Sequence, residues 1–136
     1  MAVLASGLAG VPGLSADAVV AGYVRGHPVV NGVSLRVPPR ATVGLAGPSG
    51  CGKSTLARVL TLLHQPFAGT IRLDGQLVPG YRHRTPRELR TRIGVVFQQP
   101  RLSVDPRLTL RRAIGEPLRA TRNPDPDARI TELADL

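Results

Sequence analysis

One short segment fixes the structural class of the chain, and it reads Gly47-Pro48-Ser49-Gly50-Cys51-Gly52-Lys53-Ser54-Thr55. It fits the pattern G-x-x-x-x-G-K-[ST], in which glycines let the backbone approach a ligand closely and successive N–H groups converge on phosphate oxygens. Lys53 is the only lysine among the 18 Lys and Arg residues. A slim ammonium group reaches between two phosphates, where a planar guanidinium group is too bulky. The segment therefore predicts a phosphate-binding loop.

The flanking residues supply the strand and the helix that such a loop requires. Residues 41–46 form a short apolar run, which is typical of a buried strand. The helix is expected to end near residues 64–65, because Pro66 disfavours helical geometry in the residue before it. After the loop, apolar side chains recur at the spacing of one helical face, at Leu56, Val59, Leu60 and Leu63. This order favours a P-loop over a glycine-rich turn that merely precedes a helix.

Length and composition limit the remaining choices. With 136 residues, 42% of them hydrophobic, the chain suits one compact domain. Residues 1–16 are small and mildly apolar and lack the basic segment of a secretory signal, so we expect a disordered N-terminal arm. The single cysteine excludes an internal disulfide framework and favours a cytoplasmic location.

The net charge of +9 opens a second interpretation, which is binding to nucleic acid. The arginines, however, are spread over every expected element and lack the interleaved aromatic residues that single-strand binding favours. His27, His64 and His83 are also too far apart in sequence for the spacing of a metal site. We therefore expect no nucleic acid as a partner.

Hydrophobic patterns predict further elements on both sides of the loop. Strands are expected at residues 18–24, 33–37, 70–75 and 93–97, with an Asp-Gly turn closing the third of them. Helices are expected at residues 87–92, 108–121 and 128–136, the last two separated by the breaker run 123–127.

The order of these elements resembles the ATP-binding subunit of an ABC transporter over residues 18–136. Val33-Ser34-Leu35 is similar to the "gVSf" strand of that family, and Gly69-Thr70-Ile71-Arg72-Leu73-Asp74-Gly75 is similar to its "GxIxxDG" turn. The strand that ends in the family's Q-loop glutamine resembles Ile93-Gly94-Val95-Val96-Phe97-Gln98. Stretches of the peptide and nickel importer subgroup resemble Gln99-Pro100-Arg101-Leu102-Ser103-Val104-Asp105-Pro106-Arg107 and Glu116-Pro117-Leu118-Arg119.

The resemblance implies an α/β fold, namely the N-terminal portion of an ABC-type P-loop NTPase. Its parts would be an antiparallel β subdomain, the P-loop strand and helix, the Q-loop and the start of a helical subdomain. The cofactors would be ATP and Mg²⁺. A transmembrane permease subunit would face residues 100–107, and a second ABC ATPase subunit would complete the assembly on the inner face of the cell membrane. The implied function is ATP binding that energises import of a solute of the peptide or nickel type.

The resemblance also implies roles for single residues. Tyr23 would stack on the adenine ring, and backbone amides from Gly50 to Thr55 would hold the phosphates. Lys53 would lie between the β- and γ-phosphates. Ser54 would bind Mg²⁺, and Gln98 would approach the metal and the attacking water. From the residues alone, two plainer interpretations stay open: a half-buried strand aromatic for Tyr23 and a polar strand end for Gln98.

The match to the family is partial. Arg40 stands where the family usually has glycine, and Gln99 stands where aspartate is common. No LSGGQ signature occurs in the sequence, and no apolar strand ends in Asp-Glu. We therefore expect residues 17–136 to be a truncated nucleotide-binding domain without signature motif, Walker B strand or switch histidine, which alone does not hydrolyse ATP. The alternatives are another small P-loop NTPase or kinase, and a basic nucleic-acid-binding protein.

Overall fold

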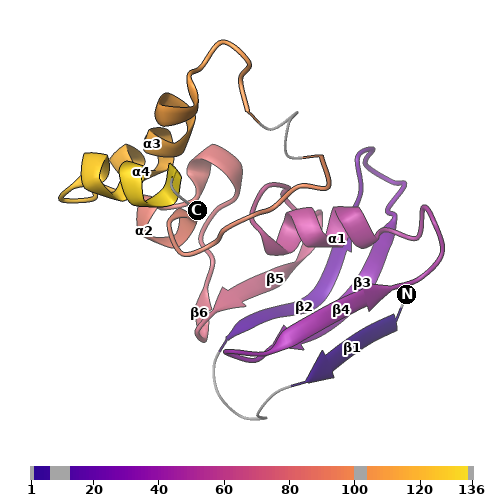
Figure 1. The fold of residues 1–136 in the computed structure, drawn as a ribbon. Coiled ribbons are helices and arrows are strands. Elements are labelled where there is room, and N and C mark those ends of the chain that lie inside the picture. Colours follow the sequence, from indigo (N-terminus) through magenta and orange to yellow (C-terminus); the bar gives the residue numbers. More distant parts are fainter. Residues whose placement is uncertain (1, 7–12, 100–103, 135–136) are drawn as a thin grey trace. The chain divides into compact units, whose positions relative to one another are not determined.

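The computed structural model describes residues 2–6, 13–99 and 104–134 of the 136 (Figure 1). The chain divides into two compact units, Met1–Ile93 and Gly94–Leu136, and each unit is described by itself.

The first unit is built around a four-stranded antiparallel sheet in the order β3-β2-β5-β6. Asp74 and Gly75 join β5 to β6 with φ values of 49° and 79°, the positive pair that a tight two-residue hairpin turn requires. The Asp-Gly turn predicted from the sequence is therefore confirmed. The strands are β2 (Leu14–Ala21), β3 (Val30–Val37), β5 (Ala68–Leu73) and β6 (Gln76–Leu77).

A bulge in β2 turns more of its side chains toward the core than simple alternation allows. The pairing of β2 with β3 shifts register between Ala16 and Val19, and both of these residues are buried. The N–H of Ala18, displaced by the bulge, donates to the hydroxyl of Ser34 at 2.9 Å. The irregular backbone is thus satisfied by a side chain from the neighbouring strand.

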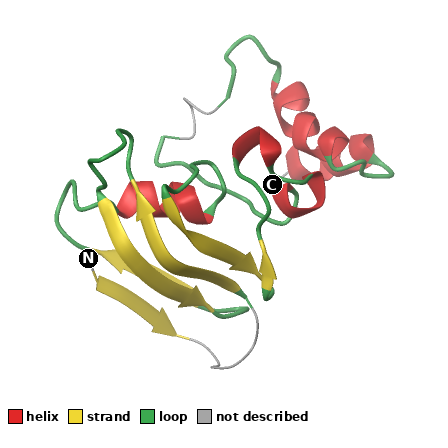
Figure 2. Ribbon diagram, turned by 180° about the vertical axis from the view of Figure 1, so that it is seen from behind, coloured by secondary structure: helices red, strands yellow, loops and turns green. Residues whose placement is uncertain are grey.

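Helix α1 (Lys53–Leu60) follows strand β4 (Thr42–Ala46) and crosses one face of the strands, where it contacts β2 (Figures 1 and 2). Leu56 and Val59 on its inner face are 0% exposed. Burying a side chain of this size stabilises the fold by about 1.5–3 kcal/mol. The helix that begins at the predicted loop is therefore anchored firmly to the sheet.

Helix α1 ends earlier than the sequence predicted. Leu62 adopts φ 62°, a left-handed conformation that ends a helix, and the N–H groups of Leu63 and His64 both turn back to the carbonyl of Arg58. This turn puts Leu62 into the core at 3% exposure and leaves Leu63 outside at 43%. The prediction that Leu63 belongs to the buried face is therefore wrong.

The N-terminal arm also differs from the prediction. Residues Ala2–Ser6 form strand β1, which pairs antiparallel with β4, and β2 already begins at Leu14. Residues 7–12 lie outside the described part of the chain. An edge strand such as β4 offers free N–H and C=O groups to any extended segment, so pairing does not require the composition that marks a strand in a sequence.

The first unit closes with the short turn η1 (Arg82–Arg84) and helix α2 (Arg87–Arg90). The predicted helix over residues 87–92 is confirmed in a shorter form. The strand predicted over residues 93–97 is not formed: Ile93 packs partly buried against the core, but Val96 is 93% exposed. An apolar run becomes a strand only where a neighbour can pair with it, and residues 93–97 pair with no strand in the described part of the chain.

The second unit is a pair of packed helices, α3 (Leu110–Ala120) and α4 (Pro126–Ala134). The hydroxyl of Thr109 accepts from the N–H of Arg112 at 3.3 Å and caps α3, and Asp125 accepts from the N–H of Ala128 at 3.0 Å and caps α4. Both predicted helices are confirmed with shifted ends. In the described ranges, every helix is too short or too polar to cross a membrane.

Candidate functional site

The predicted phosphate-binding loop lies between β4 and α1, in the order strand, loop, helix that the sequence indicated (Figure 1). Gly52 precedes the helix with φ 93°, and Gly50 has φ 77°; both are left-handed conformations that favour glycine. A Cβ on Gly52 would lie 2.7 Å from the carbonyl oxygen of Val29, which leaves no room for a side chain. The backbone of the loop therefore requires glycine at position 52 for two independent reasons.

The start of α1 is arranged for an anion. Gly52 is the N-cap residue of α1, and no side-chain hydrogen bond caps this end of the helix in the described ranges. The first turn of α1 carries no acidic residue. Free N–H groups at a helix N-terminus carry partial positive charge, which attracts phosphate. Ser54 is exposed on this first turn, so its hydroxyl is open to a ligand or a metal.

Lys53 folds back over the loop. Its Nζ donates to the carbonyl oxygens of Gly47 and Pro48, each at 2.7 Å, and lies 3.9 Å from the Sγ of Cys51. Two strong acceptors fix the ammonium group at the mouth of the loop, beside the free N–H groups of the helix. A phosphate group entering the loop would therefore meet the ammonium and the amides together.

Tyr23 is brought to the same helix. It lies just beyond β2, is 60% exposed, and accepts a hydrogen bond from Nη1 of Arg58 at 2.7 Å. A hydrogen bond from the side chain of Thr55 lowers the pKa of Tyr23 below its usual 10.0; partial burial opposes this shift and Arg58 adds to it. The exposed position does not match the interpretation of Tyr23 as a half-buried strand residue.

Gln98 belongs to the second unit, where it is exposed in a bend after residues 93–97. Its proposed approach to the metal and the attacking water stays a prediction. The stretch predicted to face a permease, residues 100–107, lies partly outside the described residues, and residues 104–107 are exposed.

The described residues include no cluster of three or more His, Cys, Asp or Glu side chains that could hold a metal. At nucleotides Mg²⁺ usually draws most of its oxygens from phosphates and water. The role of Ser54 as a Mg²⁺ ligand at the loop stays a prediction.

Sequence reasoning missed Arg58 and His64. Arg58 follows Thr55 by three residues, which places both on one side of α1. Nothing in the sequence indicates that this side meets Tyr23, which lies 35 positions away. His64 has no sequence signal either, because it reaches Tyr23 only through the early end of α1 at Leu62.

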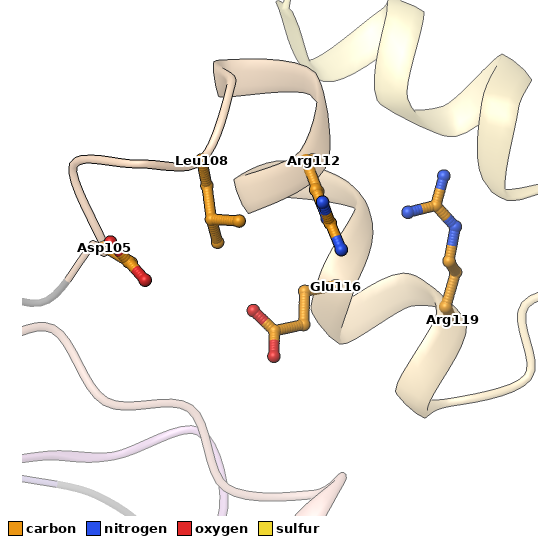
Figure 3. Close-up of a pocket in the computed structure, with 5 residues that line it drawn as sticks. All are labelled: Asp105, Leu108, Arg112, Glu116 and Arg119. Carbon is orange, nitrogen blue, oxygen red and sulfur yellow. The ribbon is translucent and has the colours of Figure 1, made fainter.

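The second unit has a cavity of its own beside α3, with a volume of about 480 Å³ (Figure 3). Acidic and basic side chains alternate around it, and three of them, Arg112, Glu116 and Arg119, follow one another along one helical face. The lining residues are Asp105, Leu108, Arg112, Glu116 and Arg119.

The left-handed glycines, the uncapped start of α1 and the ammonium group of Lys53 define a strand–loop–helix phosphate site of the P-loop class. The chain belongs to the ABC transporter family, whose model matches residues 30–135. It is 42% identical over 100 residues to a di/tripeptide transport ATP-binding protein of Pseudomonas aeruginosa, covering 71% of this chain and 31% of that protein. It is 39% identical over 115 residues to a nickel import ATP-binding protein of Shigella boydii, covering 82% of this chain and 43% of the relative. The chain thus spans less than half the length of these relatives.

The fold is also similar to that of a solved dimeric ATP-binding cassette with ADP and Pi bound. The two share 23% sequence identity with a TM-score of 0.61, over 88% of this chain and 54% of the other. At this identity the likeness concerns the fold alone. The α/β fold of ABC type inferred from the sequence is confirmed.

Proposed function

We propose that this chain binds Mg-ATP through residues 47–55, as the ATP-binding part of an importer for peptides or nickel-type solutes. The observation that carries the proposal is the loop itself: Lys53 held at its mouth, a glycine-only backbone at Gly52, and an uncapped helix start. The names of the two relatives, a di/tripeptide transporter component and a nickel importer component, support the class of solute.

The rest of the assembly belongs to the same proposal. A permease would be contacted through the segment after Gln98, a second ATPase subunit would join, and the complex would lie at the inner face of the cell membrane. Gln98 is the candidate for orienting the attacking water, since its amide both donates and accepts.

The direct test is calorimetric titration of the chain with ATP in the presence of Mg²⁺. Lys53→Ala removes the charge-assisted contacts to phosphate, which are worth about 1.5–3 kcal/mol, so affinity should fall about 10- to 150-fold. Arg36→Ala is the matched control, because Arg36 is an exposed cation at the far end of β3 from Val30, which lies beside Gly52. Equal losses in the two variants would refute the loop as the binding site.

Cys51 gives an independent readout. It is the only cysteine of the chain, so a thiol reagent labels one site, and its Sγ lies 3.9 Å from Nζ of Lys53 inside the loop. Mg-ATP should slow alkylation of Cys51, because bound phosphates cover the loop. Labelling at the same rate with and without Mg-ATP would contradict the proposal.

A further inference from the structure

The side chains around Tyr23 form a cluster that the phosphate loop alone does not explain. Arg58 donates from Nη1 to the Tyr23 hydroxyl at 2.7 Å. The imidazole of His64 lies against the phenol ring, with the two ring centroids 5.2 Å apart and the planes tilted by 49°. One tyrosine beyond β2 is therefore held by two residues that come from α1 and from the turn that ends it.

Each contact restrains a different motion of the ring. The hydrogen bond from Arg58 fixes its tip, whereas the contact with His64 limits rotation of its plane. His64 is itself fixed, since its Nε2 lies 2.8 Å from the carbonyl oxygen of Gly22. The tyrosine nevertheless stays 60% exposed, so part of its surface remains open to a flat ligand.

The cluster also connects the ring to the phosphate loop. Thr55 is the last residue of the loop motif, and its hydrogen bond to Tyr23 is the largest cause of the lowered tyrosine pKa. Arg58 lies about one helical turn further along α1. A nucleotide with its phosphates at the start of α1 would therefore find an aromatic ring that the same helix holds.

We propose that Arg58 and His64 are positioning residues that hold Tyr23 ready as a stacking platform for the base of a bound nucleotide. This inference rests on the proposed function, since it requires a nucleotide at the loop. A ring that is ordered before binding loses little further rotamer freedom when the base stacks on it, so more of the stacking energy appears as affinity.

The experiment compares Mg-ATP with Mg-tripolyphosphate, which lacks a base, by calorimetric titration of the full 136-residue chain. Arg58→Met keeps the aliphatic stem and removes the donor, and should weaken ATP binding about three- to tenfold while tripolyphosphate changes less than about twofold. His64→Ala should act in the same direction. Arg36→Met, at an exposed arginine of β3, is the matched control and should change neither affinity.

A double-mutant cycle separates positioning from direct contact. In a Tyr23→Ala chain, Arg58→Met should have no further effect on ATP binding, because the residue it positions is gone. A second readout needs no ligand. The chain has two tyrosines, and in a Tyr81→Phe background the absorbance titration reports Tyr23 alone; Arg58→Met should move its ionisation to higher pH.

Two results would overturn the inference while the proposed function stands: equal weakening of ATP and tripolyphosphate by Arg58→Met, or a full effect of that change in the Tyr23→Ala chain. If the unaltered chain binds neither ligand, the proposed function fails and the inference fails with it. The two failures are therefore distinguishable by the behaviour of the unaltered chain.

Discussion

At the residue scale, Gly52 and Gly50 of the loop are both left-handed, so alanine substitutions at the two positions form a matched pair of stability variants. Gly52→Ala puts a Cβ 2.7 Å from the carbonyl oxygen of Val29 and 3.0 Å from Cγ2 of Val30, at φ 93°. Conformational strain and overpacking together should destabilise the fold by about 2–4 kcal/mol. Gly50→Ala meets nothing within 4 Å at φ 77°, so only the strain of about 1–2 kcal/mol remains. Urea unfolding measures both, and equal losses would show that the close approach at Gly52 does not exist in solution.

The two tyrosines should respond to alkaline pH in opposite directions. Burial raises the pKa of Tyr81 above its usual 10.0, so its contribution to stability is present below pH 10 and is lost as the pH rises through the higher folded-state value. The urea midpoint of Tyr81→Phe should therefore fall less between pH 9 and pH 11 than the urea midpoint of the unaltered chain.

Tyr23→Phe is the control for that comparison. The pKa of Tyr23 is lowered, first by the hydrogen bond from Thr55, so the folded state favours its ionised form, and the resulting stability appears above the unfolded value of 10.0. Replacement by Phe removes this gain, and the Tyr23→Phe chain should lose more stability than the unaltered chain between pH 9 and pH 11. Parallel responses of the two variants would contradict the assigned environments.

The loop residues could be predicted from sequence because each is required locally: glycines by backbone geometry, Lys53 by its reach, Ser54 by its hydroxyl. The contact between Arg58 and Tyr23 could not, because it spans 35 positions and depends on how α1 lies on β2. Sequence patterns report neighbours along one element, whereas the cluster of Tyr23, Arg58 and His64 joins residues from the end of β2 with residues from α1 and its following turn.

At the scale of elements, helices α3 and α4 meet at Gly115. A Cβ there would lie 2.8 Å from Cδ1 of Ile130, which is 1% exposed. Gly115→Ala alone should be close to neutral, since a gain in helix propensity of about 1 kcal/mol offsets the crowding. Ile130→Val alone should cost about 0.5–1.5 kcal/mol, because it removes that Cδ1 and leaves a void. In the double variant the new Cβ fills the void, so the loss of unfolding free energy should be smaller than the sum of the losses in the two single variants. A loss equal to that sum would argue against the contact.

Element types were predicted better than element ends or pairings. The strand, loop and helix around residues 41–60, the Asp-Gly turn and the two C-terminal helices follow from local periodicity and turn chemistry. The early end of α1 depends on Leu62 entering the core, and β1 depends on an open edge of β4. Residues 93–97 have the composition of a strand without a strand partner in the described part of the chain. All three depend on contacts that lie far away in sequence.

At the scale of the whole molecule, residues 93–97 indicate how the chain behaves in solution. Val95, Val96 and Phe97 are 38%, 93% and 44% exposed in an apolar segment of high β propensity that has no regular secondary structure. Open backbone groups beside apolar side chains favour pairing between chains. The unaltered chain should therefore associate as its concentration rises, as measured by light scattering, and Val96→Lys should reduce this association.

Leu110→Lys separates charge from strand pairing. Leu110 is 70% exposed, so its replacement adds the same charge to a chain that already carries +9, but it lies in α3, where the helix itself uses most backbone groups. If unpaired backbone in residues 95–97 drives association, Leu110→Lys should leave the light-scattering profile nearly unchanged while Val96→Lys shifts it. Equal effects would mean that net charge alone controls solubility, and that residues 95–97 promote association no more than any other exposed apolar site.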